Sequence, residues 1–226
     1  MPITYEQVLP WGRSFDEYRR MFGLTDVDLG RRILGCGDGP AAFNAAMCRR
    51  GYRVVSVDPL YRFGQEQIEG RIAEVTDIIL EQTYQNRNLF RWDAIRDIDE
   101  LKGLRHLAMR EFLEDYPAGL ADGRYVAAEL PLLPQPDKSF DLAICSHFLF
   151  LYSDQLDLNF HIRSIDEILR VAAEVRIFPV VDVNAKVSPH LEEVICHFSQ
   201  RGNAHLVTVD YEFQIGANQM LRIRAA

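Results

Sequence analysis

Residues 32–60 constrain the fold of this chain more than any other stretch. An apolar strand runs into the loop Gly35-Cys36-Gly37-Asp38-Gly39-Pro40, a helix of small residues follows, and a second apolar strand, residues 54–57, ends on Asp58. A strand, a glycine loop, a helix and a second strand that ends on a carboxylate make half of a nucleotide-binding βαβ unit. The sequence therefore predicts a parallel α/β sheet with a ligand site at the carboxyl ends of its strands.

The glycine spacing narrows the kind of ligand. A dinucleotide fingerprint has glycine at its first, third and sixth positions, and the sixth position here is Pro40, which argues against nicotinamide and flavin cofactors. An adenosine group still fits, because glycines at alternate positions remove Cβ atoms where a ligand crosses the strand end. Asp58 lies about 20 residues after the loop, where a carboxylate accepts hydrogen bonds from ribose hydroxyls. The alternative is a turn-forming Asp before Pro59.

Composition limits the class of protein. The chain has 226 residues, 48% of them hydrophobic, which is enough for a full core and predicts one domain over residues 1–226. Its formal net charge is −8, so no overall positive field attracts nucleic acid or an anionic membrane. The four cysteines form no CxxC pair, and no signal peptide or long apolar run is present. We expect free thiols and a soluble, cytoplasmic protein.

The first 28 residues form an N-terminal helical segment. Ser14 and Glu17 have the spacing of a capping box, and Phe15, Tyr18 and Phe22 fall on one face of the helix that follows. Two interpretations fit this pattern: the helix packs on the sheet, or it closes over a cofactor.

Residues 61–125 are too long for a simple crossover connection. Apolar residues repeat at helical spacing from Ile68 to Ile79 and from Leu101 to Tyr116, and a third helical piece is expected over residues 89–98. The pattern predicts a helical insertion, or lid, between the second and third strands, packed over the carboxyl ends of the strands.

The other elements complete a seven-stranded sheet. The predicted strands cover residues 29–34, 54–57, 125–128, 140–145, 174–181, 205–213 and 219–224, and the predicted crossover helices cover residues 40–50, 157–171 and 190–201. Pro40 is expected at the first helical position. The last two strands are joined through Gly216-Ala217-Asn218, which is short enough for a hairpin, so the last strand is expected to be antiparallel.

Three motifs together resemble a known family. The loop Ile33-Leu34-Gly35-Cys36-Gly37-Asp38-Gly39, the pair Val57-Asp58 and the run Leu133-Pro134-Gln135-Pro136-Asp137-Lys138-Ser139-Phe140-Asp141-Leu142 are similar to motifs of class I S-adenosylmethionine-dependent methyltransferases, most of all to small-molecule enzymes with the loop "LPFPDxSFD". Ile168-Leu169-Arg170-Val171-Ala172 resembles a helix end of that family. The resemblance covers residues 29–60 and 125–226. It implies a Rossmann-like methyltransferase sheet.

The resemblance also implies a cofactor site. Its residues are Gly35, Cys36, Gly37, Asp38, Gly39, Asp58, Pro59, Glu129, Leu130 and Ser146. Asp58 would hold the ribose, Glu129 the adenine amino group, and Leu130 an apolar wall of the ring. Ser146 would lie beneath the reactive methyl group. Glu129 also fits a solvated loop acid.

Two positions depart from the family pattern. The family usually carries an acid at the position of Ile33, so the ammonium group of the cofactor needs another acceptor. Asp38 is our hypothesis for that acceptor, and an electrostatic role at the helix N-terminus is the alternative. The second departure is Ala172-Ala173-Glu174 in place of Pro-Gly-Gly, which changes a turn.

Catalysis has less support in the sequence. If the acceptor is a hydroxyl, a general base is useful, and the candidates are His147 and Tyr61, followed by Asp154, His161 and Tyr152. Packing in an aromatic loop is the alternative for His147. We expect no metal site, because Cys145, His147 and the nearby acids lack the spacing of a complete ligand set.

These observations predict S-adenosylmethionine-dependent methyl transfer to a small-molecule acceptor. The alternative is a methyltransferase-like protein that binds the cofactor or a partner without turnover, which Ile33 favours. A nucleic-acid methyltransferase is disfavoured by the acidic composition, and no Asn/Asp-Pro-Pro-aromatic signature follows the fourth strand.

Overall fold

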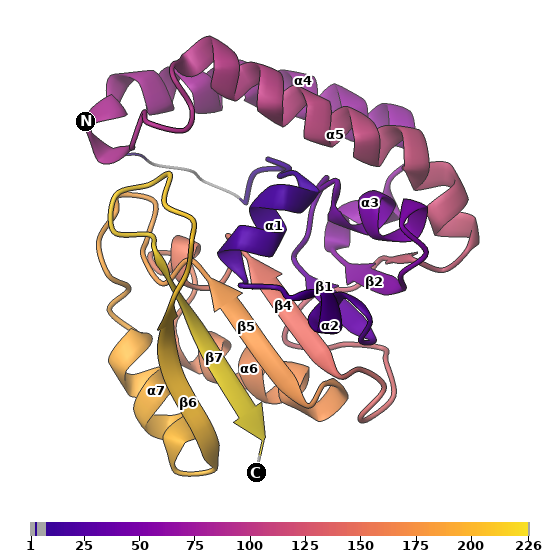
Figure 1. Cartoon of the computed structure of the whole chain (residues 1–226), viewed down its shortest axis with the longest axis vertical. Coiled ribbons are helices and arrows are strands. Elements are labelled where there is room, and N and C mark those ends of the chain that lie inside the picture. Colours follow the sequence, from indigo (N-terminus) through magenta and orange to yellow (C-terminus); the bar gives the residue numbers. More distant parts are fainter. Residues whose placement is uncertain (1–2, 4–7, 226) are drawn as a thin grey trace.

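The computed structural model describes residue 3 and residues 8–225; the remaining parts of the predicted N-terminal segment, residues 1–2 and 4–7, lie outside the described residues. The chain forms one seven-stranded sheet with the order β3-β2-β1-β4-β5-β7-β6 (Figure 1). The strands are β1 Ile33–Cys36, β2 Val54–Val57, β3 Tyr125–Val126, β4 Leu142–Ser146, β5 Glu174–Phe178, β6 Gly202–Thr208 and β7 Gln219–Ala225.

The direction of the strands agrees with the expectation from sequence. Strand β1 pairs in parallel with β2 and β4, whereas β7 is antiparallel to both β5 and β6. The predicted α/β class, with a Rossmann-like sheet of seven strands and an antiparallel last strand, is confirmed. Because β1 lies between β2 and β4, the chain reverses its winding direction there, which is where open α/β sheets bind ligands.

Helices cover both faces of the sheet. The helices α1 Phe15–Met21, α2 Asp26–Leu29 and α3 Phe43–Arg49 pack against one face through Ile33, Val54 and Ile144. The helices α6 Leu158–Val171 and α7 Leu191–Ser199 pack against the other face through Leu34, Cys145 and neighbouring strand residues. Neighbouring strand residues point to opposite faces, so strands buried on both sides are apolar throughout.

Two long helices lie between β2 and β3. The helices α4 Gln65–Gln85 and α5 Ile98–Ala121 form an antiparallel pair across the carboxyl end of the parallel strands (Figure 1). Ile68 and Ile72 of α4 meet Phe112 and Tyr116 of α5 in a separate buried cluster. This arrangement places α4 over the ligand edge of the sheet.

The segment before α1 displaces the predicted start of α3. We expected Pro40 at the first helical position, and the helix instead begins at Phe43 with Ala42 as its N-cap. The backbone N–H of Ala42 donates to the carbonyl of Arg13 over 3.0 Å, and a Cβ on Gly12 would lie 2.1 Å from the Pro40 carbonyl oxygen. The N-terminal segment therefore crosses directly over the loop and occupies the place of a first helical turn.

Other boundaries also differ from the sequence interpretation. Residues 26–29, close to the expected start of the first strand, form α2, because Thr25 and Asp28 make a capping box. The expected helical piece over residues 89–98 is absent: after the short turn Arg87–Leu89 the chain pairs with the 209–218 link, where Arg91 N–H donates to the Phe213 carbonyl. That link is also longer than the expected tight hairpin.

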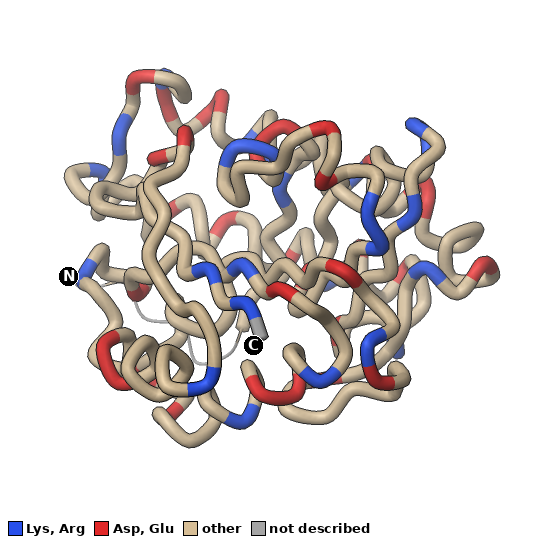
Figure 2. The backbone as a smooth tube through the Cα atoms, turned by 60° about the horizontal axis from the view of Figure 1, so that its bottom comes forward, with Lys and Arg blue, Asp and Glu red and all other residues tan. Residues whose placement is uncertain are grey.

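Charged residues of both signs are interspersed along the described chain (Figure 2). No helix among the described residues is long and apolar enough to cross a membrane.

Candidate active site

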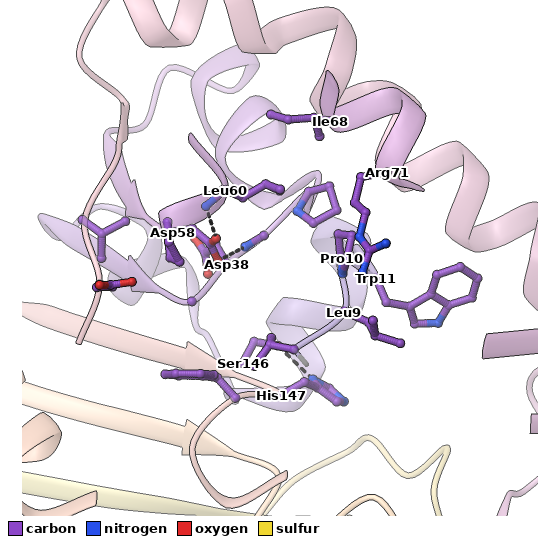
Figure 3. A pocket seen from close by; sticks show the side chains of 18 of the residues that line it. Leu9, Pro10, Trp11, Asp38, Asp58, Leu60, Ile68, Arg71, Ser146 and His147 are labelled. Carbon is purple, nitrogen blue, oxygen red and sulfur yellow. Dashed lines mark hydrogen bonds between the residues drawn. The ribbon is translucent and has the colours of Figure 1, made fainter. Parts of the chain in front are cut away.

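A large cavity of about 1040 Å³ opens at the carboxyl ends of β1, β2 and β4. Figure 3 shows its walls: Asp38 and Asp58 on one side, Ser146 and His147 below, Arg71 and Ile68 of α4 above, and Leu9, Pro10 and Trp11 on the side of the N-terminal segment. Of the ten predicted cofactor residues, all but two line this cavity: Gly37, Asp38, Gly39, Asp58, Pro59, Glu129, Leu130 and Ser146.

The glycines of the loop have two different roles. Gly37 and Gly39 line the cavity with φ values of +65° and +52°, a left-handed backbone that favours glycine. Gly35 does not line the cavity; a Cβ there would lie 1.8 Å from Oδ2 of Asp38, so its hydrogen makes room for that carboxyl group. Cys36 is fully buried in the core on the α6 face. Neither Gly35 nor Cys36 offers a side-chain surface to a ligand in the cavity.

Asp58 is tied to the backbone on both sides. Its Oδ2 accepts the N–H of Gly39 and its Oδ1 accepts the N–H of Leu60, each over 2.8 Å. Burial raises the pKa of Asp58, and the two backbone bonds oppose that rise. A carboxylate has about four acceptor positions, so each oxygen keeps one for a ligand hydroxyl. Pro59 follows on the cavity wall and begins the short turn Pro59–Arg62.

Asp38 lies inside the loop rather than at a helix N-terminus. Its carboxyl group accepts hydrogen bonds from the hydroxyls of Ser56, over 2.6 Å, and Tyr18, over 3.1 Å. Burial raises the pKa of Asp38 to about 7, although these two bonds lower it. A pKa of about 7 makes the protonation of Asp38 depend on pH near neutrality. Because α3 begins at Phe43, Asp38 does not cap that helix.

The opposite end of the cavity is more open. Glu129 is exposed and its carboxylate lies 3.5 Å from the guanidinium of Arg62. Leu130, only 8% exposed, lines the wall beside it. This pairing of an exposed acid with an apolar wall suits a flat polar ring better than a deeply buried charge.

His147 lies in a strained, half-buried position after β4. Its φ is +50°, its backbone N–H donates to the Phe178 carbonyl, and its Nδ1 lies 2.9 Å from Oγ of Ser146. Burial, and then the charges of Arg13 and Arg105, lower the pKa of His147 well below its ordinary value. The imidazole is therefore neutral at neutral pH, which is the form that accepts a proton.

The structure brings His147, but not Tyr61, to the cavity wall. The Tyr61 hydroxyl donates to the Gly39 carbonyl over 2.8 Å, and its ring packs against Phe112, Tyr116 and Tyr125. Burial raises the pKa of Tyr61 well above its ordinary value. Tyr61 thus supports the glycine loop, and we do not retain it as a base.

The other candidate bases, His161, Tyr152 and Asp154, either are hydrogen-bonded to the backbone or lie outside the cavities. Both ring nitrogens of His161 lie within hydrogen-bond distance of backbone carbonyls, those of Asp157 and Leu149. The Tyr152 hydroxyl accepts the N–H of Leu9, and Asp154 is exposed and outside both cavities described here. Among the described residues, no group of three or more His, Cys, Asp or Glu side chains could hold a metal ion.

A small cavity of about 110 Å³ adjoins the large one. Leu9, Trp11, Arg13 and His147 line both cavities and form the partition between them. Six aromatic residues line the small cavity: Trp11, Phe90, Tyr152, Phe178, Tyr211 and Phe213. The site therefore has two compartments that meet at an imidazole and a guanidinium group.

Sequence reasoning missed the residues that the N-terminal segment and α4 bring to the site. Trp11, Arg13 and Arg71 lie outside every recognised motif. The available signal was the capping box at Ser14, which indicates a helix start but not where the preceding residues lie. Tyr18, on the predicted apolar face of α1, also reaches the large cavity.

No family model matches the chain. Among solved structures, the fold is similar to that of WbdD, a bifunctional kinase-methyltransferase, with a TM-score of 0.51, 14% identity, and coverage of 93% of this chain but only 40% of that one. A second similar structure is 1,6-didemethyltoxoflavin-N1-methyltransferase of Burkholderia thailandensis, with a TM-score of 0.48, 13% identity, and coverage of 93% of this chain and 78% of that one.

A sequence comparison finds a relative with higher identity than the solved structures above. An uncharacterized protein of Methanocaldococcus jannaschii, MJ0045, is 33% identical over 215 residues, which cover 94% of each chain. That identity extends over both the sheet and the helical pair α4–α5. The chain belongs to the same protein family as MJ0045.

Proposed function

We propose that this chain transfers a methyl group from S-adenosylmethionine to a small-molecule acceptor. The observation that carries the proposal is the two-compartment site: a large cavity with a glycine loop and Asp58, and a small aromatic cavity that meets it at His147. One compartment suits the methyl donor and the other suits an acceptor.

The residues of the large cavity fit the donor. Its volume of about 1040 Å³ is ample for a nucleoside joined to an amino acid, since ligand sites usually span roughly 300–1,000 Å³. Gly37 and Gly39 leave space along the loop, Asp58 keeps acceptor positions for two ribose hydroxyls, and Glu129 and Leu130 suit the adenine ring. When bound, S-adenosylmethionine supplies a methyl group on a positively charged sulfur.

Asp38 takes the part of the acid that is missing at Ile33. The Ile33 side chain is 1% exposed and packs in the core on the α1–α3 face, so it cannot reach a ligand. Asp38 lines the cavity from within the loop and shifts to its charged form when a cation approaches, because an opposite charge lowers the pKa of a carboxyl group. We assign to it the ammonium group of the donor.

His147 is proposed to receive the proton of the acceptor. Methyl transfer mainly needs in-line placement and exclusion of water, which a closed site supplies before any base acts. The segment around Trp11 and helix α4 cover the large cavity from outside, and His147 stands between the compartments in its neutral form. A neutral imidazole there accepts a proton when the acceptor is a hydroxyl group.

A second candidate function is cofactor or partner binding without turnover. The replaced acid at Ile33 and the strongly lowered pKa of His147, which makes a weak base, favour it. The enzyme and the cofactor-binding version of this candidate differ in turnover but share donor binding.

Calorimetry with S-adenosylhomocysteine, with NAD⁺ as comparison, tests the binding step. We expect saturable binding of S-adenosylhomocysteine and none of NAD⁺, and thermal stabilisation of about 2.7 kcal/mol at a ligand concentration 100 times the dissociation constant. Absence of S-adenosylhomocysteine binding contradicts both the enzyme and the cofactor-binding version of the second candidate, and leaves only partner binding. Methyl transfer from labelled donor to any member of a phenol, amine and carboxylic-acid panel then separates the enzyme from the binding protein.

A further inference from the structure

Among the residues that the structure describes, the small cavity is lined by more positive than negative charge. Two guanidinium groups line it, those of Arg13 and Arg105, and none of its described lining residues carries a carboxylate. Arg105 is 1% exposed, and Arg13 is half-buried. Burying a cation without a partner is costly, so the buried Arg105 needs a compensating anion, and the half-buried Arg13 is stabilised by one.

Glu17 compensates for one of the two charges. Its Oε2 accepts hydrogen bonds from Nη1 of Arg105 over 2.7 Å and from the backbone and hydroxyl of Ser14, while its Oε1 accepts the Tyr211 hydroxyl over 2.9 Å. These four hydrogen bonds direct the Glu17 carboxylate to Arg105, Ser14 and Tyr211. No hydrogen bond joins Glu17 to Arg13 in the described structure.

Arg13 is left with donors to spare. Its Nη1 donates to the Trp11 carbonyl over 2.9 Å, while its Nε is buried and has no hydrogen-bond partner among the described residues. Burial, and then the neighbouring Arg105, lower the pKa of Arg13, although the charges of Tyr211 and Glu17 act in the opposite direction. A guanidinium group has five N–H donors in a planar fork that matches a carboxylate.

We propose that the small cavity binds the acceptor through a carboxylate on a small aromatic body, with Arg13 as the residue that recognises it. The identification of the bound molecule as the methyl acceptor rests on the proposed function. The predicted binding of an aromatic carboxylate in the small cavity does not depend on that function. Among the described residues, two guanidinium groups at this cavity face one nearby carboxylate, that of Glu17, and the one remaining positive charge matches a monoanion rather than a phosphate dianion. The volume of about 110 Å³ suits a single ring, and the six aromatic walls suit its faces.

The residues between the two cavities fix where the carboxylate of the acceptor lies relative to His147. Arg13 and His147 line both compartments, so a ring held by Arg13 presents its other substituents near the imidazole. The reacting atom gains the methyl carbon, the bonding electrons of the broken carbon–sulfur bond stay on the sulfur, and the proton of the acceptor passes to His147. The carboxylate stays bound to Arg13 and takes no part in the transfer.

Ligand binding to the full chain tests the inference with three probes: benzoate, the isosteric neutral benzamide, and phenyl phosphate. We expect benzoate to bind at least about tenfold more tightly than benzamide and more tightly than phenyl phosphate, because bonds to a charged partner are the stronger ones. Equal affinities for benzoate and benzamide overturn the inference. Tighter binding of phenyl phosphate overturns the assignment to a carboxylate.

Two variants locate the effect. Arg13→Gln removes the charge and should abolish the preference for benzoate over benzamide. Arg20→Gln is the matched control, because Arg20 is exposed, lies over the Tyr211 ring and lines neither cavity. An unchanged preference in Arg13→Gln overturns the inference. If that variant does not fold, the comparison of the probes on the parent chain still decides.

The test separates this inference from the proposed function. Probe binding is measured first without S-adenosylhomocysteine, whose own binding is measured independently. Benzoate binding that depends on Arg13, in a chain that does not bind S-adenosylhomocysteine, supports the carboxylate site while the methyltransferase proposal fails. If the chain binds S-adenosylhomocysteine but shows no preference for benzoate over benzamide, the proposed donor binding is supported and the carboxylate site is contradicted.

Discussion

The backbone N–H of Gly39 donates a hydrogen bond to Oδ2 of Asp58 over 2.8 Å, which joins the glycine loop to the end of β2. The Leu60 N–H binds the other carboxylate oxygen, so Asp58 organises the loop and the turn after β2 at the same time. Asp58 thus has two tasks: it shapes the wall of the large cavity and offers acceptor positions to a ligand.

Asp58→Asn should weaken S-adenosylhomocysteine binding by about tenfold or more, since bonds to a charged acceptor contribute roughly 1.5–3 kcal/mol. The amide also turns a donor toward one of the two backbone N–H groups. Calorimetry measures the change, and Asp154→Asn is the control because Asp154 is exposed and lines neither cavity. Equal losses in the two variants contradict the assignment of Asp58.

Asp38 should make stability and ligand affinity depend on pH. Burial raises its pKa in the folded chain to about 7 from an ordinary 3.8, so between these values the folded state holds a proton that the unfolded state has released. The contribution of Asp38 to the free energy of unfolding therefore falls as pH rises from about 4 to 7, by at most about 4 kcal/mol.

Asp38→Asn should remove that dependence, so that the variant gains stability relative to the parent chain as pH rises toward 7. Chemical denaturation at several pH values measures the difference. S-adenosylhomocysteine affinity should rise with pH through 7 in the parent chain, because the charged carboxylate binds the ammonium group, and should be nearly flat in Asp38→Asn. A parent affinity that does not change with pH removes Asp38 as the acceptor of that group.

His147→Asn should separate chemistry from donor binding. Asparagine tolerates the left-handed backbone at φ +50° better than most residues but cannot accept a proton as imidazole does. With a hydroxyl acceptor, we expect kcat to fall by about 10²-fold or more, the usual contribution of a positioned base. The dissociation constant of S-adenosylhomocysteine should stay within about threefold of the parent value. That is less than the tenfold change that a loss of about 1.4 kcal/mol in binding free energy produces. If the kcat of His147→Asn stays near the parent value, His147 is not the base, and the proton of the acceptor passes to water.

Glu17 should protect the fold against acid. Burial alone would raise the pKa of Glu17, but contact with Arg105 and the Ser14 backbone brings it to about 2, below the ordinary 4.5. A depressed pKa contributes stability that is present above about 4.5 and is lost as pH falls toward 2.

Glu17→Gln should lower the free energy of unfolding at neutral pH by about 3–5 kcal/mol, because it leaves Arg105 buried without its charge partner. The difference between variant and parent should shrink as pH falls below 4.5. Glu100→Gln is the control, since Glu100 pairs with Arg96 on the surface. A difference that stays constant down to pH 2 indicates that lost packing, not charge, causes the destabilisation.

Local patterns made much of the fold predictable. The apolar strands around Ile33 and Val54, the capping box of Ser14 and Glu17, and the helical repeats from Ile68 and Leu101 depend on neighbours a few residues away. The glycine loop and Asp58 were equally accessible, because a strand end followed by glycines and a helix gives a parallel sheet its ligand edge. The start of α3 could not be predicted from local sequence, because the segment around Gly12 and Arg13, far from α3 in sequence, crosses the loop before this helix.

By itself, the sequence determined the α/β class and the antiparallel last strand. Of the loop residues that it indicated, Gly37, Asp38 and Gly39 line the large cavity, whereas Gly35 and Cys36 do not. The tertiary structure alone decided that Asp38 turns inward to Ser56 and Tyr18, that Tyr61 supports the loop, and that Arg13 lines both compartments. The physical reason is distance along the chain. Secondary structure arises from contacts between near neighbours, whereas Glu17 and Arg105 are 88 residues apart, and only the folded chain shows that these two charges pair.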